Sequence, residues 1–235
     1  MEDLERYGDY NDYEDDEPKK KSPIGLILKI LIGVVCFAVI ALLGARLILF
    51  NYYPDSIKNI YFNDKLTAYY NSTDGKLGAK TQNLSAPYDD PDVGNFFCDN
   101  LIVIPGINQL QISLRYNVSL IAAIKEAYGV DLSADAELFE FSLSIIPIGD
   151  SDADPIATGS LSYSKMESFM MYRYYKLVFD DVQLTVPDCE EVWIRLEIRL
   201  KDVDKAKPYH VLIYEDTAKT PFDDYKLSRK ERPAK

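Results

Sequence analysis

The sequence predicts a mainly β protein in which a single N-terminal transmembrane helix precedes an antiparallel β-sandwich. Three observations support this fold class. Residues 24–50 form an apolar run that is long enough to cross a lipid bilayer. Beyond this run, apolar and polar residues alternate with period two in several segments, which is typical of half-buried strands. Gly, Pro and Asp residues that favour turns separate these segments.

The membrane-spanning helix is predicted over residues 22–50. A helix rises 1.5 Å per residue, so about 20 residues cross ~30 Å of hydrocarbon. Its two charges, Lys29 and Arg46, lie near its ends, where long side chains reach the headgroups. Tyr52 and Tyr53 follow at the interface, which favours such rings. The run is longer than the apolar part of a typical signal peptide, so we expect a retained anchor in the bilayer.

The orientation of this anchor follows from its basic flanks. Lys19, Lys20 and Lys21 precede the helix and outweigh the lysines that follow it. Because basic residues stay on the cytoplasmic side, we expect a type II orientation in the cell membrane. The N-terminus would then be cytoplasmic, and the C-terminal domain would lie outside the cell.

Acidic residues dominate the chain, whose formal net charge is −12. Residues 1–21 are rich in carboxylates and poor in apolar side chains, so we expect a disordered cytoplasmic tail. Most of the remaining negative charge falls on the predicted exterior domain. An acidic domain repels phosphate backbones, so nucleic acid is excluded as a partner.

After a juxtamembrane linker at residues 51–57, residues 58–225 form one predicted domain, and the basic residues 226–235 are expected to fray. Strands with one apolar face must stack or close on themselves, and we expect an immunoglobulin-like sandwich. The predicted strands are 110–116, 139–145, 172–179, 182–186, 192–200 and 209–214, with weaker candidates at 59–62, 65–70 and 101–104.

One segment has helical rather than strand periodicity. Leu120, Ile121 and Ile124 fall on one face of a helix predicted over about residues 119–128. Ser119 can cap its start, and Gly129 can end it in the left-handed conformation. Residues 75–95 are polar and rich in turn formers, so a long loop is expected there.

Two groups of residues are candidate structural sites. On an oxidising face Cys98 and Cys189 can form a disulfide, and the alternative is two unrelated thiols. Asp150, Asp152 and Asp154 resemble the start of a calcium loop, but the Gly and Glu that complete an EF-hand are missing. The alternative is a solvated turn between two strands. We expect no catalytic residue and no cofactor.

A tyrosine cluster is the candidate binding surface. Tyr172 and Tyr174 flank Arg173 on one predicted strand, and rings that point away from the core can stack on a sugar or a protein. We therefore expect a non-enzymatic, membrane-anchored domain that binds an envelope protein, a polysaccharide or a subunit of a complex. Two alternatives stay open: an envelope glycan hydrolase with a carboxylate pair, and a structural or signalling ectodomain.

Overall fold

The computed structural model describes residues 23–84, 96–130, 137–150, 153–183, 192–201, 203, 209–212 and 222–233. The chain divides into two compact units, one ending at Tyr52 and the other spanning Tyr53–Lys235. The predicted acidic tail and its three lysines, Lys19, Lys20 and Lys21, lie outside the described residues.

The first unit contains one long helix, α1 (Pro23–Asn51). Within it, Ile27–Ile48 is long and apolar enough to cross a membrane, either as an anchor or as a signal sequence. Its large apolar side chains are exposed, as expected for a helix whose solvent is lipid. The predicted apolar helix is therefore confirmed, with Lys29 and Arg46 inside its ends.

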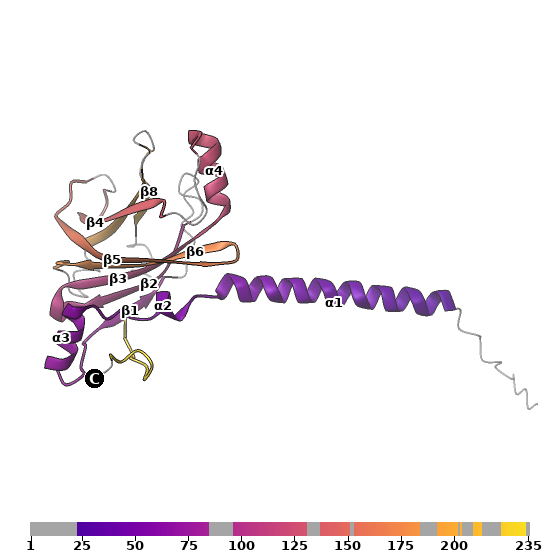
Figure 1. Ribbon diagram of the computed structural model, residues 1–235, viewed down its shortest axis with the longest axis horizontal. Helices are drawn as coiled ribbons and strands as arrows, with labels where there is room; N and C mark the ends of the chain where they lie inside the picture. The colour runs from indigo at the N-terminus through magenta and orange to yellow at the C-terminus, as the bar shows by residue number, and fades with distance from the viewer. Residues whose placement is uncertain are drawn as a thin grey trace, which may run out of the picture. The chain divides into compact units, whose positions relative to one another are not determined.

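The second unit is built on one antiparallel sheet with the order β8-β7-β4-β5-β6-β3-β2-β1-β9 in the described part of the chain (Figure 1). Its strands are β1 (Lys80–Asn83), β2 (Phe96–Ile104), β3 (Gln109–Asn117), β4 (Phe139–Pro147), β5 (Ala157–Phe169), β6 (Tyr172–Asp180), β7 (Val192–Leu200), β8 (Tyr209–Leu212) and β9 (Asp223–Asp224). Within the described residues, four short helical segments accompany it, namely α2 (Asp55–Lys58), α3 (Asp64–Ser72), η1 (Pro105–Ile107) and α4 (Ser119–Tyr128).

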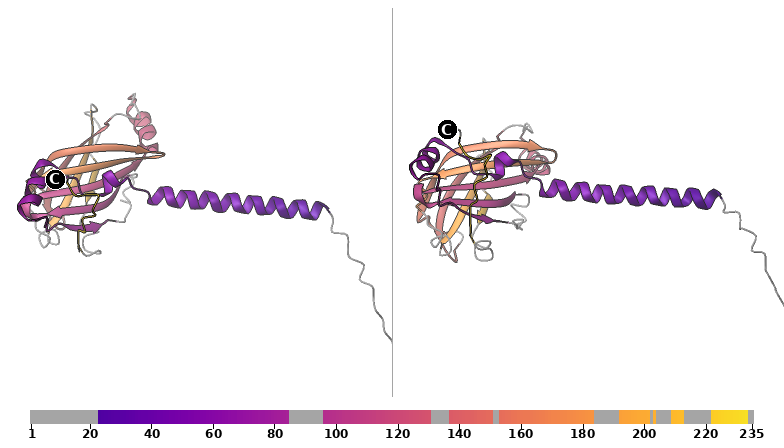
Figure 2. Two further views of the ribbon diagram at one scale, coloured as in Figure 1. Left: turned by 60° about the horizontal axis from the view of Figure 1, so that its bottom comes forward. Right: turned by 90° about the horizontal axis from the view of Figure 1, so that it is seen from below.

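The sheet curls at β5, which pairs with a different neighbour at each end. Its first residues pair with β4, with Gly159 opposite Leu143. From Ser160 onward it pairs with β6 as far as Phe169 and Tyr172. The two halves of the sheet bury their apolar side chains in one shared core, to which β2, β3, β4, β6 and β7 contribute. Figure 2 shows the same sheet from two further directions. The mainly β prediction is confirmed, but the strands form one continuous half-barrel, and the immunoglobulin-like sandwich is not confirmed.

Helix α4 spans the predicted residues. Leu120, Ile121 and Ile124 are buried in the main core, and Gly129 ends the helix with φ 65°. Its start differs from the prediction because Val118 is the N-cap residue and the Asn117 side chain accepts the Ser119 N–H at 2.9 Å.

Other sequence predictions were wrong in part. The weak strand candidate at 65–70 is helix α3, which the Asn63 side chain caps by accepting the Leu66 N–H. The expected loop at 75–95 contains β1, and residues 85–95 lie outside the described part. In the segment 182–186, Val182 follows β6 without strand pairing, and 184–186 are not described. Strand β5 was not predicted, because its side chains are mostly polar and partly exposed.

Candidate functional site

The outer face of the sheet is covered by the segment that follows α1. We call residues 53–63 the N-terminal strap. Ile57 is fully buried against Tyr172 and Tyr174 of β6, and the Tyr53 ring meets the Tyr174 ring edge-on at 4.9 Å. The residues expected to form a juxtamembrane linker, 51–57, therefore include side chains of the domain's own packing. Figure 1 shows α2 and α3 on the side of β1, β2 and β3 opposite to β4 and β8.

Side chains on the outer face hold the strap in place. The Gln111 amide accepts the Tyr61 N–H and donates to the Tyr61 carbonyl, both at 2.8 Å. The Ser113 hydroxyl donates to the Ile57 carbonyl at 2.7 Å, and the Asn100 amide donates to the Lys58 carbonyl at 3.0 Å. These bonds satisfy backbone groups that have no ladder partner, because the strap is not a strand of the sheet.

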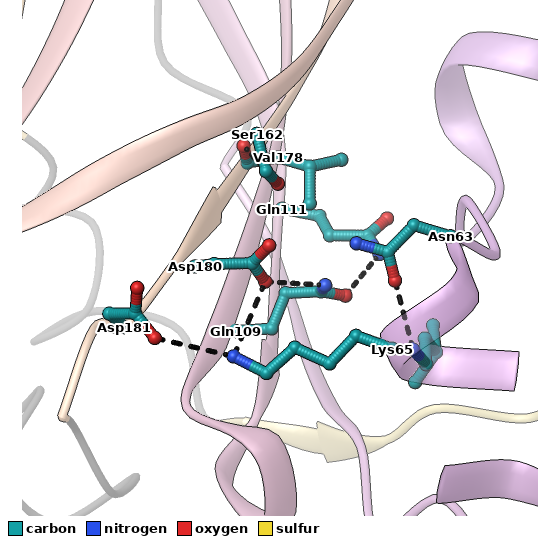
Figure 3. A network of polar contacts seen from close by, with 9 residues as sticks. Asn63, Lys65, Gln109, Gln111, Ser162, Val178, Asp180 and Asp181 are labelled. Carbon is teal, nitrogen blue, oxygen red and sulfur yellow. Dashed lines mark hydrogen bonds and ion pairs between the residues drawn. The ribbon is translucent and has the colours of Figure 1, made fainter. Parts of the chain in front are cut away.

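A polar network continues from the strap to the start of α3 (Figure 3). Gln111 donates to Gln109, which donates to the Asp180 carboxylate, each at 2.9 Å. The Nζ atom of Lys65, at the start of α3, lies 3.9 Å from Asp180 Oδ1 and 3.4 Å from Asp181 Oδ1. This chain of contacts links α3, β3 and the end of β6 into one unit (Figure 3).

The C-terminal segment closes over the strap from the other end of the chain. The Tyr225 hydroxyl accepts the Ile60 N–H at 2.9 Å and donates to the Glu231 carboxylate. Glu231 also accepts the Ser228 N–H at 2.7 Å. Burial raises the pKa of Glu231, but the hydrogen bonds from Ser228 and Tyr225 outweigh burial and hold its pKa below the usual range. Glu231 is therefore an ionised side chain in this region near neutral pH.

Two clefts lined mainly by polar residue types adjoin where these chain ends meet. The first cleft, about 530 Å³, lies against β5, and its lining residues are Asp55, Ser56, Asn59, Ile60, Tyr61, Tyr163, Lys165, Ser228, Lys230 and Glu231. The second, about 610 Å³, lies against β1 and β9, and its lining residues are Lys58, Asn59, Thr81, Asn83, Asn100, Asp223, Asp224, Tyr225, Lys226 and Glu231. Asn59 and Glu231 line both clefts, so the two hollows share a border.

The wall of the first cleft is ordered by stacking and by charge pairing. The rings of Tyr61 and Tyr163 stack with centroids 3.7 Å apart at an interplanar angle of 9°. Lys165 forms an ion pair with Glu167 at 2.6 Å, and Glu167 also accepts the Ser56 hydroxyl. The hydrogen bond with Glu167 raises the pKa of Lys165, so both groups stay charged over a wide pH range.

A buried lysine lies on the same face of the sheet. Lys176 of β6 pairs with Ser113 of β3 on one side and with Lys165 of β5 on the other. It has no exposed surface, and its ammonium has no hydrogen-bond partner among the described residues. Burial lowers the pKa of Lys176 to about 7, an effect that the charge of Glu231 opposes. This amine is consequently partly deprotonated at physiological pH.

The predicted tyrosine surface is buried. Tyr172 and Arg173 are each 8% exposed, and Tyr174 has no exposed surface. The prediction assumed that one face of this strand meets solvent, whereas the strap covers that face. The Arg115 guanidinium stacks there on Tyr53 and Tyr172, with its central carbon 5.3 and 5.1 Å from the two ring centroids. The exposed rings expected for binding are thus packing residues.

The remaining predicted residues are not brought together in the described part. Asp150 and Asp154 are exposed in the connection between β4 and β5, and Asp152 is not described. Among the described residues, no group of three His, Cys, Asp or Glu side chains could hold a metal ion. Cys98 is buried in β2, and Cys189 lies outside the described residues, so the disulfide stays a prediction. Tyr52 is exposed after α1.

With this geometry in place, comparison with known proteins adds no identity: no protein family, no curated protein and no solved structure matches the chain.

Proposed function

We propose that α1 anchors the protein in the cell membrane, that the half-barrel domain lies outside the cell, and that its two adjoining clefts bind a hydroxyl-rich polymer such as an envelope glycan. The basic residues before α1 support this orientation, because they favour a cytoplasmic N-terminus. The observation that carries the binding proposal is the lining of the clefts.

That lining matches the chemistry of a glycan. Asn59 offers both a donor and an acceptor, Ser56 can accept while its hydroxyl donates to Glu167, and Lys165 and Glu231 supply charge-assisted partners for hydroxyl groups. Tyr163 adds an aromatic ring of the kind that packs against the apolar face of a sugar.

The common border of the clefts favours a polymer over a small metabolite. An extended chain can occupy both hollows and cross the border at Asn59 and Glu231. Both clefts are framed by the strap and the C-terminal segment, which are hydrogen-bonded to each other through Tyr225. A framework of this kind holds the polar groups in position before the ligand arrives, which lowers the entropic cost of binding.

Binding is better supported than glycan cleavage. A glycosidase acid needs a carboxyl whose pKa is raised so that it is protonated near neutral pH. Hydrogen bonding from Lys80 lowers the pKa of Asp224, and the pKa of Glu231 is lowered as described above. Among the described residues, Asp99 is a carboxyl whose pKa is raised overall, to about 6, because burial outweighs its other interactions. It does not line either cleft.

The test is glycan binding by the full-length protein in lipid nanodiscs, measured against immobilised oligosaccharides prepared from cell-envelope glycans. Replacing Tyr163 by Ala or Asn59 by Ala should weaken binding about tenfold, since each change removes a contact worth about 1.4 kcal/mol. Glu140→Ala, on an exposed position of β4, is the matched control and should bind as the unmodified protein does. Equal binding by all variants, or no binding to any glycan, would contradict the proposal.

A further inference from the structure

The hairpin that joins β5 to β6 presents two methionines at its tip. Phe169 and Tyr172 form the last pair of the ladder, which leaves Met170 and Met171 as a two-residue turn. Met170 is 67% exposed and Met171 is 45% exposed. Exposing large apolar side chains to water is unfavourable, so their presence at a loop tip points to an apolar partner.

The turn chemistry supports this reading. Met170 has φ 50°, in the left-handed region, where two-residue hairpin turns favour Gly, Asn or Asp. The other described non-glycine residues with positive φ are Asp74, Asn108 and Asp181, whose short polar side chains tolerate that conformation. Met170 alone in this group carries a long apolar side chain. Met170 thus occupies a position where the backbone conformation favours other residue types.

The tip lies at the end of the domain where the chain enters from α1. Tyr53, the first residue of the domain, packs against Tyr174, and Phe169 packs in the same cluster. From Tyr174 to Met171 is three strand residues, or about 10 Å. Only Tyr52 separates Tyr53 from the last residue of α1, so the chain between them spans at most about 7 Å. The covalent chain therefore sets an upper limit on the distance between the tip and the end of α1.

We propose that Met170 and Met171 insert into the interfacial layer of the bilayer that α1 spans. This inference rests on the membrane anchor of the proposed function. Unbranched, flexible methionine side chains suit a disordered acyl boundary, and the partly buried Phe169 beside them is an aromatic residue of the kind that the interface favours. The second contact orients the domain with the β5–β6 tip toward the membrane and the opposite end of β5 away from it.

The test uses full-length protein in liposomes whose phosphatidylcholine is brominated on its acyl chains, because bromine quenches tryptophan fluorescence at short range. The natural tryptophan is first removed by Trp193→Phe, and single tryptophans are then introduced as Met171→Trp, Ile156→Trp and Phe37→Trp. Ile156 is the matched control: it is 64% exposed and lies beside the opposite end of β5, about 40 Å from the tip along the strand. Phe37 lies within α1 and reports whether that helix is inserted.

Quenching of about twofold or more at positions 37 and 171, with none at 156, is the expected result. Quenching at 37 without quenching at 171 overturns the hairpin contact and leaves the anchor in place. Quenching at 171 and 156 alike overturns the orientation, because contact is then not confined to the tip. No quenching at 37 overturns the anchor and the hairpin contact with it.

A second variant separates the side chains from the fold of the hairpin. Met170→Gly with Met171→Asn places Gly at the residue of positive φ, as a type II′ turn favours, and should leave the melting temperature unchanged or higher. A reporter at Phe169→Trp should be quenched when the methionines are present and lose at least about half of that quenching in the Gly-Asn variant. Equal quenching in both backgrounds would overturn the role of the methionines, and no quenching in either would overturn the contact of the tip with the bilayer.

Discussion

At the scale of single residues, burial of the Lys176 amine on the outer face is unfavourable for the stability of the fold. Its side chain is fully buried without a described hydrogen-bond partner, although Glu231 contributes a favourable charge. A protein accommodates a buried ammonium group when the group loses its proton or when it pairs with an opposite charge. The low pKa of Lys176, about 7, indicates that it gives up the proton near neutral pH.

Replacing Lys176 by Met should therefore stabilise the protein, by about 1–4 kcal/mol below pH 7, the range seen when buried charges give way to apolar side chains. The folded-state pKa lies below the value of 10.5 for a free lysine. Between these pH values the unfolded chain binds a proton that the folded chain lacks, so the stability of the unmodified protein rises with pH. The advantage of the Met variant should then shrink from pH 7 to about pH 10.5.

Urea unfolding of both proteins at pH 6 and pH 10 measures this difference. Lys165→Met is the control, since Lys165 of the neighbouring strand β5 forms an ion pair with Glu167 of the same strand, and its replacement should gain nothing. A Met variant that is equally or less stable at pH 6 would show that the amine at 176 is well accommodated in its charged form.

At the scale of elements, the corner of the sheet depends on Gly159. It is the residue of β5 that still pairs with β4, while Ser160 already pairs with β6. A Cβ at position 159 would lie 2.7 Å from Val182 Cγ2 and 3.1 Å from Leu143 Cδ2. The absent side chain allows the two halves of the sheet to approach closely where they join.

Gly159→Ala should consequently lower the free energy of unfolding by about 1–3 kcal/mol through overpacking. Chemical denaturation measures the loss, with Ser160→Ala on the exposed neighbouring position as control. Adding Val182→Ala removes the closest contact and should recover part of the stability. A Gly159→Ala variant as stable as the unmodified protein would mean that the corner has room for a side chain.

Elements with a clear period and a cap could be predicted from sequence. Strands β3, β4, β6 and β7 each carry apolar residues at every second position, and α4 ends at Gly129. Strand β5 lacks an apolar face of its own because much of it stays partly exposed, so no periodic signal marks it. The signal for α3 was present in Asn63 and in the spacing of Leu66 and Tyr69, but a short polar segment also fits a strand.

At the scale of the whole molecule, the clefts could not be predicted because segments that are distant in the sequence form them. Tyr61, Tyr163 and Glu231 come from the strap, β5 and the C-terminal segment, and only the folded chain brings them together. One sequence signal did exist for the covered face. Gln109, Gln111 and Ser113 are neutral hydrogen-bonding residues where an open strand face commonly carries charges, and this indicates that another segment covers it.

The central claim is that the half-barrel lies outside a membrane crossed once by α1, and cysteine labelling tests it most directly. Thr158→Cys places a thiol on an exposed position of β5 in the full-length protein. Intact cells are treated with a membrane-impermeant maleimide, and permeabilised cells and the unmodified protein serve as controls. The account predicts that intact cells label the variant beyond the unmodified protein. Labelling of position 158 only after permeabilisation would place the domain in the cytosol and contradict the account.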